Sequence, residues 1–250
     1  PPASPGGGGN PAPTTKTIDG VTVRATTQSD GTVITTVLPV STNRHDDPIS
    51  LFSQYADIPV TNNSTGDTLL TVSLPTGVGL NIAGKSQSLS LQAASNDITQ
   101  RIAQKTGSNS SLTQEIINHA QNFLATLAAD ERVTVQAITP SISNNQLLDV
   151  PIIITGSNSN SDDQQMLIVD AGNLPSGTTI QLDNVAFASI IGAARVVGGN
   201  GENFVVGDNQ NQYIVLGTDD DTLFGGGGND TIGSLAGNDQ TSGDAGDDIV

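Results

Sequence analysis

The chain has no cysteine and no tryptophan, and few of its residues are aromatic or basic. Without cysteine it can form neither a disulfide scaffold nor a thiolate metal site. Aromatic residues make up 3% of the 250 residues, so a packed core must be built from Val, Ile, Leu and Ala. Eight Lys and Arg stand against 25 Asp and Glu, and the formal net charge is −17. This charge disfavours nucleic acid and anionic membrane surfaces as partners and favours cations.

The sequence has no long apolar run, and its start does not have the pattern of a signal peptide. The longest mostly apolar run, VAFASIIGAARVV at 185–197, is too short to cross a bilayer and contains Arg195, so we expect no membrane insertion. The start, PPASPGGGGNPAPTT, lacks the basic and apolar regions of a signal peptide. We interpret residues 1–16 as a Pro/Gly-rich linker, and we expect Pro1 to lie inside a longer protein.

Residues 17–180 predict a β-rich domain with helices near 96–106 and 112–129. Alternating Val and Thr around Asp30-Gly31, in IDGVTVRATTQSDGTVITTVLPV, predict a β-hairpin. Further strands are predicted at 68–75, 85–93, 132–140, 150–156 and 165–172, and residues 41–66 are predicted to be irregular.

Two segments carry helix signals. In SNDITQRIAQKTG, either Ser95 or Asn96 can cap the helix, and Gly107 can end it. In the second segment, Ser111 and Gln114 have the spacing of a capping box. Its apolar residues then share one face at helical spacing: Leu112, Ile116, Ile117, Ala120, Phe123, Leu124, Leu127 and Ala128.

From residue 198 onward the chain divides into nine-residue blocks without insertion or deletion. The blocks are GGNGENFVV, GDNQNQYIV, LGTDDDTLF, GGGGNDTIG, SLAGNDQTS and GDAGDDIV. The eighth position reads Val205, Ile214, Leu223, Ile232, Thr241 and Val250, and the sixth reads Asn203, Gln212, Asp221, Asp230, Asp239 and Asp248. In a disordered acidic tail we expect no residue type to recur every nine residues at two separate positions. The blocks therefore predict a repeating structure.

The residue types explain why the sixth and eighth positions of the blocks are regular. Glycines allow a tight turn whose carbonyl oxygens point inward, and the sixth-position Asp adds a carboxylate. Such an oxygen-only cage suits calcium. Two blocks make one coil of a solenoid, so Asp221 should stack under Asp239, and Asp230 under Asp248. No Lys or Arg follows Arg195, while residues 198–250 carry one Glu and nine Asp. Such a segment repels itself unless cations lie between the coils.

These blocks resemble the nonapeptides of the RTX (repeats-in-toxin) family, whose pattern is G-G-x-G-x-D-x-U-x. GGGGNDTIG at 225–233 matches fully, and LGTDDDTLF, SLAGNDQTS and GDAGDDIV depart at one or two positions. The resemblance covers about a fifth of the chain and says nothing of residues 1–180. It implies a right-handed parallel β-roll over 181–250, with calcium between stacked turns. It also implies a secreted or cell-surface bacterial protein, usually exported by a type I system.

The family's calcium ligands are turn carbonyls and sixth-position aspartates. They map onto the turns at 216–221, 225–230, 234–239 and 243–248. The candidate metal residues are Asn203, Asp219, Asp221, Gly225, Gly227, Asp230, Asp239 and Asp248. Asn203 and Gln212 stand where the family has Asp, which leaves calcium binding by the first two turns open.

The apolar pattern at the eighth position begins earlier in the chain than the acidic pattern at the sixth position. Counting back by nines from Val205 gives Val196 and Phe187, whereas the sixth positions there are Ala194 and Val185. We hypothesise that residues 180–212 form metal-free coils that template the calcium-dependent ones. The sequence stops inside a block, so we expect self-association, or further repeats, to cover the exposed strand edge.

Three functions compete. We favour a non-enzymatic calcium-binding module that folds on calcium outside the cell and supports adhesion or extracellular assembly. The alternative is the non-catalytic C-terminal part of a secreted RTX enzyme or toxin. An enzyme within these residues is disfavoured because the H-E-x-x-H and G-x-S-x-G motifs are absent, and His45 and His119 are isolated. A pore-forming role lacks apolar segments of useful length.

Overall fold

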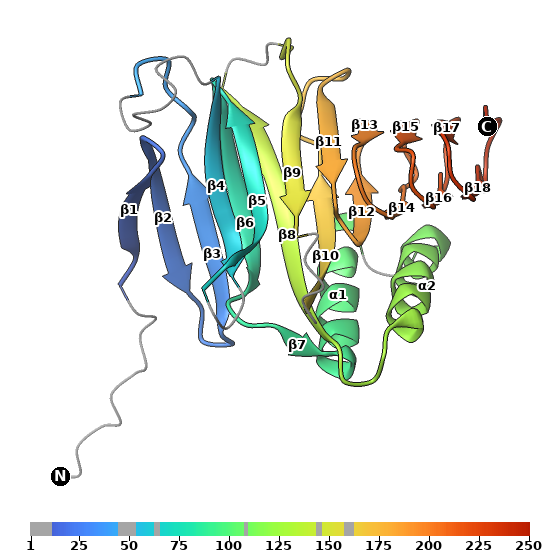
Figure 1. Cartoon of the computed structure of the whole chain (residues 1–250), viewed down its shortest axis with the longest axis horizontal. Coiled ribbons are helices and arrows are strands. Elements are labelled where there is room, and N and C mark those ends of the chain that lie inside the picture. Colours follow the sequence, from blue (N-terminus) through green and yellow to red (C-terminus); the bar gives the residue numbers. More distant parts are fainter. Residues whose placement is uncertain (1–11, 45–53, 63–65, 108–109, 144–146, 158–162) are drawn as a thin grey trace.

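A computed structural model of the chain describes residues 12–44, 54–62, 66–107, 110–143, 147–157 and 163–250. The strands of these residues form two sheets that share a buried core (Figure 1). The 11-stranded sheet has the order β1 (Thr14–Ile18), β2 (Val21–Thr27), β3 (Thr32–Val37), β6 (Val78–Lys85), β8 (Arg132–Ile142), β10 (Asp163–Asp170), β12 (Phe187–Ile191), β14 (Phe204–Val206), β16 (Thr222–Phe224) and β18 (Gln240–Ser242), with β7 (Leu89–Ser90) paired to β8. The seven-stranded sheet has the order β17 (Thr231–Ser234), β15 (Tyr213–Leu216), β13 (Arg195–Gly198), β11 (Thr179–Asp183), β9 (Ile152–Gly156), β5 (Thr68–Pro75) and β4 (Tyr55–Asn62).

Each sheet changes from antiparallel to parallel along its length. In the larger sheet, pairing is antiparallel from β1 to β8 and parallel from β8 to β18. In the smaller sheet, β4, β5 and β9 are antiparallel, and β9 to β17 are parallel. The expected fold class, a β-rich N-terminal part with two helices followed by parallel coils, is confirmed. The proposed division between 17–180 and 181–250 stays a prediction, since both sheets run through it.

Aliphatic side chains from the two sheets fill the inside of the coils. Ile214 lies between Val196 and Ile232 in the smaller sheet, and Val205 lies between Ala188 and Leu223 in the larger. All six side chains are buried, with at most 4% of their surface exposed. At about 25 cal/mol per Å² of buried apolar surface, this stack drives coil formation, as the eighth-position pattern predicted.

Two helices, α1 (Leu91–Thr106) and α2 (Ser111–Thr126), cover the outer face of the larger sheet (Figure 1). Their apolar faces form a second core with β8, β10, β12 and β14. Phe123 of α2 packs on Phe187 and Phe204, with ring centroids 5.4 and 5.8 Å away. In the part of the chain that the structure describes, neither helix is both long enough and apolar enough to cross a membrane.

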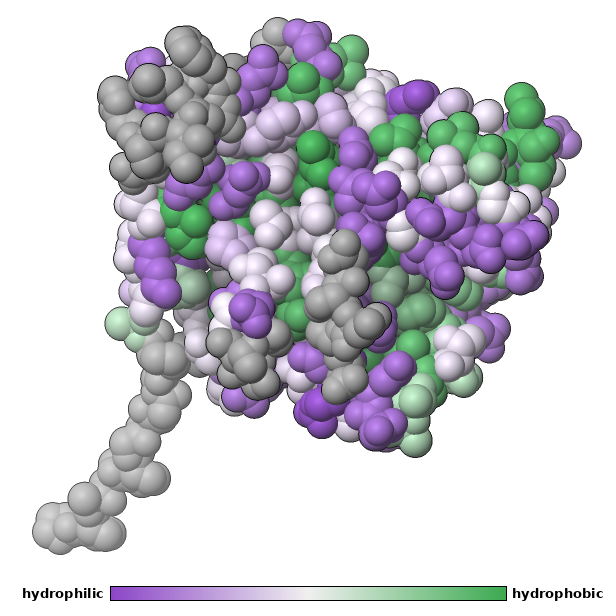
Figure 2. Space-filling view, viewed as in Figure 1, coloured by the Kyte–Doolittle hydropathy of each residue, from purple (hydrophilic) through white to green (hydrophobic). Residues whose placement is uncertain are grey.

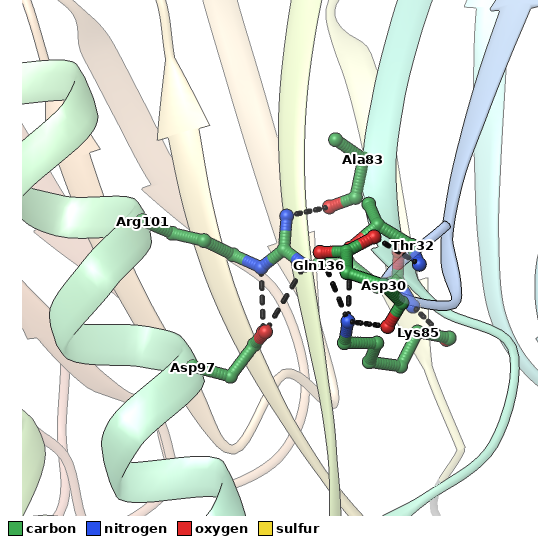
Figure 3. A network of polar contacts seen from close by, with 7 residues as sticks. All are labelled: Asp30, Thr32, Ala83, Lys85, Asp97, Arg101 and Gln136. Atoms are coloured by element: carbon green, nitrogen blue, oxygen red, sulfur yellow. Dashed lines mark hydrogen bonds and ion pairs between the residues drawn. The ribbon is translucent and has the colours of Figure 1, made fainter. Parts of the chain in front are cut away.

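Arg101 fixes α1 to the sheet (Figure 3). Its Nε lies 2.6 Å from Oδ2 of Asp97, and it donates to the carbonyl oxygen of Ala83 on β6 at 3.0 Å. Only 8% of Arg101 is exposed, so its charge is paired and hydrogen-bonded as burial requires. Lys85 on β6 reaches the turn between β2 and β3, where its Nζ donates to the Asp30 carbonyl oxygen at 2.6 Å. These contacts tie the helix and the hairpin to the same strand.

Several predicted strands are present, and some predictions are wrong. The hairpin of β2 and β3 and the strands β5, β8, β9 and β10 lie where the sequence placed them. Of the strand predicted near 85–93, only the two-residue β7 forms after β6 ends at Lys85, because α1 begins at Leu91 after the cap residue Ser90, and not at Ser95 or Asn96. The earlier start adds Ala94 to the residues of α1 that are buried against the sheet.

The cap of α2 is also shifted by one residue. Ser110, not Ser111, accepts the backbone N–H of Thr113 at 3.0 Å, and Gln114 donates to Asn118 instead of closing a capping box. Thr113 is buried, so the first turn of α2 is set by packing as well as by its cap.

Two segments predicted without strands contain them. Residues 14–16, placed in the linker, belong to β1. Residues 55–62, within the stretch expected to be irregular, form β4 despite Pro59. Because β4 is the edge strand of its sheet and its register shifts after Pro59, the missing N–H of proline is tolerated there.

Candidate metal centre

The turns between the coil strands form two rows on opposite sides of the roll. The first turn row contains 198–203, 216–221 and 234–239, and the second turn row contains 207–212, 225–230 and 243–248. Figure 2 shows hydrophilic residues gathered at the end of the molecule that carries these coils. Each row stacks equivalent residues eighteen positions apart.

Sixth-position residues are joined from coil to coil by hydrogen bonds. The N–H of Asp230 donates to Oδ1 of Asp248, and the N–H of Asp221 donates to Oδ1 of Asp239, both at 2.9 Å. The same bond joins Asn203 to Asp221 at 2.9 Å and Gln212 to Asp230 at 2.7 Å. The predicted eighteen-residue stacking is therefore present. One oxygen of each carboxylate is used in this way. The second oxygen of Asp221 accepts the Ser234 hydroxyl at 3.2 Å, whereas that of Asp230 has no partner among the described residues.

The second oxygen of Asp230 lies in an oxygen-lined space. Asp230 is 1% exposed, and its Oδ2 has no hydrogen-bond partner among the described residues. A Cβ added at Gly225 would lie 2.8 Å from this oxygen and 2.7 Å from the carbonyl oxygen of Gly243. The missing side chain of Gly225 thus leaves room between a carboxylate and a carbonyl of the next coil. An oxygen-only site of this kind fits Ca²⁺.

The hydrogen bonds compensate only partly for the burial of these carboxylates. Burial, together with the charges of Asp248, Asp208 and Asp244, raises the pKa of Asp230 to about 6, against the hydrogen bond from Gln212. Burial also raises the pKa of Asp221, while the N–H of Asn203 lowers it. A bound cation would reverse both effects, since it favours the ionised form.

The other candidate residues take different places. Oδ2 of Asp219 accepts the N–H of Gly201 one coil earlier at 2.8 Å, and Asp219 is exposed. Gly227 donates its N–H to the Asp208 carbonyl oxygen at 2.7 Å. Asp239 is exposed and Asp248 is half-buried. The structure thus groups Asp221 with Asp239, and Asp230 with Asp248.

Asn203 and Gln212 differ from the aspartates in what they offer to the preceding coil. Nε2 of Gln212 donates to the carbonyl oxygens of Ile190 and Gly192 at 3.3 and 3.0 Å, and to Oδ1 of Asp208 at 2.9 Å. Nδ2 of Asn203 donates to the carbonyl oxygen of Val185 at 2.9 Å. Both side chains are buried, and their oxygens have no partner within the described ranges.

Sequence reasoning missed Asp208. It occupies the second position of its block, where the fully matching block has Gly226. Its Oδ2 accepts the N–H of Gly192 at 2.9 Å, and its Oδ1 accepts Gln212 and the N–H of Gln210. Burial raises the pKa of Asp208. An acidic residue at a glycine position, in GDNQNQYIV, was the available signal.

A second group of metal-ligating side chains lies where α2 meets the roll. Glu115 and His119, one helical turn apart, place ligand atoms within 4.8 Å of one another and of Asp244. The ring of His119 packs on Phe224 with centroids 3.9 Å apart. Ligand atoms around one bound Zn²⁺ lie roughly 3.4 Å apart, given bonds of about 2.0–2.1 Å, so this group is more open than a formed site.

Comparison with known protein families agrees with the repeat geometry. The family model of the RTX calcium-binding nonapeptide repeat (4 copies) matches residues 197–232, 206–241 and 215–250. Successive matches begin nine residues apart, which is the step of the blocks. No curated protein and no solved structure matches the chain. Residues 197–250 therefore match the RTX calcium-binding nonapeptide repeat, and the match is limited to this segment of the chain.

Proposed function

We propose that the chain is a calcium-binding module whose C-terminal coils fold around Ca²⁺. The observation that carries this proposal is the buried Oδ2 of Asp230, which has no partner among the described residues and faces the Gly243 carbonyl oxygen across the space at Gly225. A buried carboxylate oxygen without a donor or cation is destabilising. A divalent ion bound there removes that cost and links neighbouring coils.

Calcium binding of this kind is coupled to folding. The oxygens of one site come from different coils, so the site does not exist in the unfolded chain and binding energy becomes folding energy. Residues after Arg195 supply no Lys or Arg to neutralise the nine aspartates of 198–250. We expect site dissociation constants of roughly 10⁻⁴–10⁻³ M, the range of extracellular modules.

Such weak affinity suits a secreted or cell-surface bacterial protein that folds where calcium is abundant. In this proposal the N-terminal sheets present a surface for adhesion or extracellular assembly, and the roll stabilises them. The chain itself catalyses no reaction. The alternative, that it is the non-catalytic C-terminal part of a secreted RTX enzyme or toxin, keeps the same role for the coils.

Calcium titration tests the proposal. Isothermal titration of the metal-free chain should show Ca²⁺ uptake accompanied by a gain of β signal in circular dichroism, and Mg²⁺ at the same concentration should produce neither. Asp230→Asn should weaken the uptake, whereas Asn211→Asp, at an exposed position of the same turn row, should not. Absence of calcium uptake by the unmodified chain would refute the proposal. Turnover in a hydrolase panel would refute its non-enzymatic part.

A further inference from the structure

We infer that Asn203 and Gln212 are boundary amides: their nitrogens close the preceding coil without metal, and their oxygens join the first calcium layer. The inference has a nitrogen half, which concerns the amide NH₂ groups, and an oxygen half, which concerns the amide oxygens. Only the oxygen half rests on the proposed calcium function. The inference assigns a direction to the roll, with metal-free coils on one side of these two residues and calcium-dependent coils on the other.

The nitrogen half follows from the surroundings of the Gln212 amide. Its NH₂ group lies among three oxygens, from Ile190, Gly192 and Asp208. Oxygens that converge in this way can be satisfied by a cation or by a donor group. Because only the nitrogen end of the amide donates, it must face these oxygens. The NH₂ group thus satisfies these oxygens without a cation.

The oxygen half follows from the other end of the same side chain. A Cβ added at Gly207 would clash with both Oε1 of Gln212 and the carbonyl oxygen of Gly225. This pair corresponds, one coil earlier, to Oδ2 of Asp230 and the Gly243 carbonyl oxygen at Gly225. Gln212 is 4% exposed, and its Oε1 has no partner in the described part of the chain. Amide carbonyl oxygens are accepted calcium ligands.

Asn203 repeats the arrangement in the first turn row. Its Nδ2 donates back to the Val185 carbonyl oxygen, and its Oδ1 is buried without a partner among the described residues. Its own N–H donates forward to Oδ1 of Asp221. Both turn rows therefore carry an amide in the same coil, so the boundary runs through both sides of the roll.

A carboxylate could not serve at this boundary. Both of its oxygens accept, so it would face the carbonyl oxygens of the preceding coil and would need a cation there as well as in the next layer. The positions one coil earlier offer no ligand side chain, since Val185 and Ala194 stand there. Calcium layers are thus expected at four residue pairs: 203 with 221, 212 with 230, 221 with 239, and 230 with 248.

Hydrogen exchange of the full chain tests the inference, with and without calcium. In calcium-free buffer, residues 185–206 of the unmodified chain should stay protected, while residues 221–250 lose protection. Gln212→Glu replaces the donor with an acceptor, so protection of 185–206 in calcium-free buffer should fall at least tenfold and return when Ca²⁺ is added. Asn203→Asp should behave in the same way.

Matched controls separate the amide role from added charge. Gln210→Glu and Asn211→Asp add the same charge at exposed positions of the same turn, and neither should change the protection of 185–206. Gln212→Ala removes both ends of the amide, so its loss of protection should not be rescued by Ca²⁺.

The outcomes that overturn the inference are distinct from failure of the proposed function. Equal behaviour of Gln212→Glu and Gln210→Glu in calcium-free buffer would overturn the nitrogen half. Uniform loss of protection over 185–250 in the unmodified chain, or failure of Ca²⁺ to restore Gln212→Glu, would overturn the boundary. If the unmodified chain takes up no calcium, the proposed function and the oxygen half fail, while the calcium-free comparison still decides the nitrogen half.

Discussion

At the scale of single residues, the sixth position of the nonapeptide decides what joins two coils. Asp230 offers two acceptors, one for the N–H of Gln212 and one, Oδ2, that lacks a donor among the described residues. Gln212 at the equivalent position offers one donor group and one acceptor. If calcium binds as proposed, the same backbone geometry accommodates either a cation or an amide, according to one side chain.

Replacing the central carboxylate should weaken calcium binding. Asp230→Asn removes charge from the layers on both sides of Asp230, so we expect calcium affinity to fall by about tenfold or more, which corresponds to about 1.4 kcal/mol. Isothermal titration checks this. Asp247→Asn, at an exposed position near Asp248, is the matched control and should bind calcium as the unmodified chain does.

Calcium affinity should also depend on pH near 6. Protons compete with Ca²⁺ for Asp230, whose pKa burial raises to about 6, so affinity at pH 5 should be about tenfold lower than at pH 7.5. In the metal-free protein the sign is opposite. The folded pKa lies above the unfolded value, so protonation of Asp230 stabilises the coils at low pH, and this contribution is lost as pH rises through 6. Titrations at both pH values, repeated with Asp230→Asn, measure the effect, and an unchanged pH dependence in that variant would contradict it.

At the scale of elements, glycines keep the turns open for an ion. Gly225→Ala would place a Cβ 2.7 Å from the Gly243 carbonyl oxygen and 2.8 Å from Oδ2 of Asp230. We expect this variant to lose calcium affinity and stability in the coils. Gly233→Ala, with nothing within 4 Å of its added Cβ, is the control. Calcium titration and thermal unfolding of both variants should separate them, and equal behaviour would argue against a site at Gly225.

The cap of α2 gives a second test at this scale. Ser110→Ala removes the acceptor of the Thr113 N–H, so the free energy of unfolding should fall by about 1 kcal/mol. Ser111→Ala should have little effect, because the Ser111 side chain does not cap the helix. Denaturant unfolding of the two variants distinguishes them, and a larger loss for Ser111→Ala would contradict the observed cap.

Local patterns predicted most of the elements, and non-local contacts account for the errors. Asp30-Gly31 and the eighth-position aliphatics act within their own turn or strand, so their sequence signals sufficed. The pairing of β6 with β8 spans both helices, and no local pattern specifies it. The docking of α2 on the roll depends on Phe204 and Phe224, which face out of the coils. The orientation of the Gln212 amide depends on oxygens about twenty residues earlier, which composition does not reveal.

At the scale of the whole molecule, the two sheets continue from the N-terminal strands into the coils. Strand β10 pairs with β8 on one side and β12 on the other, so the N-terminal part covers the first coil. The larger sheet thereby presents an ordered edge on which the roll can grow. In the proposed function the acidic coils need calcium, whereas the aliphatic core of the N-terminal strands does not.

Heating should reveal this difference. We expect two unfolding transitions in calorimetry, of which calcium raises one and leaves the other nearly unchanged. At 10 mM Ca²⁺ and dissociation constants of roughly 10⁻⁴–10⁻³ M, each site should add about 1.4–2.7 kcal/mol to the calcium-sensitive transition. A single transition that moves as a whole with calcium would show instead that the two parts unfold together.

The eighteen-residue register also sets how much chain each layer stores. A coil advances the roll by one strand spacing, about 4.8 Å, whereas eighteen extended residues reach roughly 60 Å. Each coil that opens on calcium withdrawal would therefore release a length of extended chain more than ten times the height of the folded coil. If calcium binds as proposed, a segment anchored at both ends would lengthen as calcium is withdrawn, and the calcium concentration would set the largest distance between the two anchors.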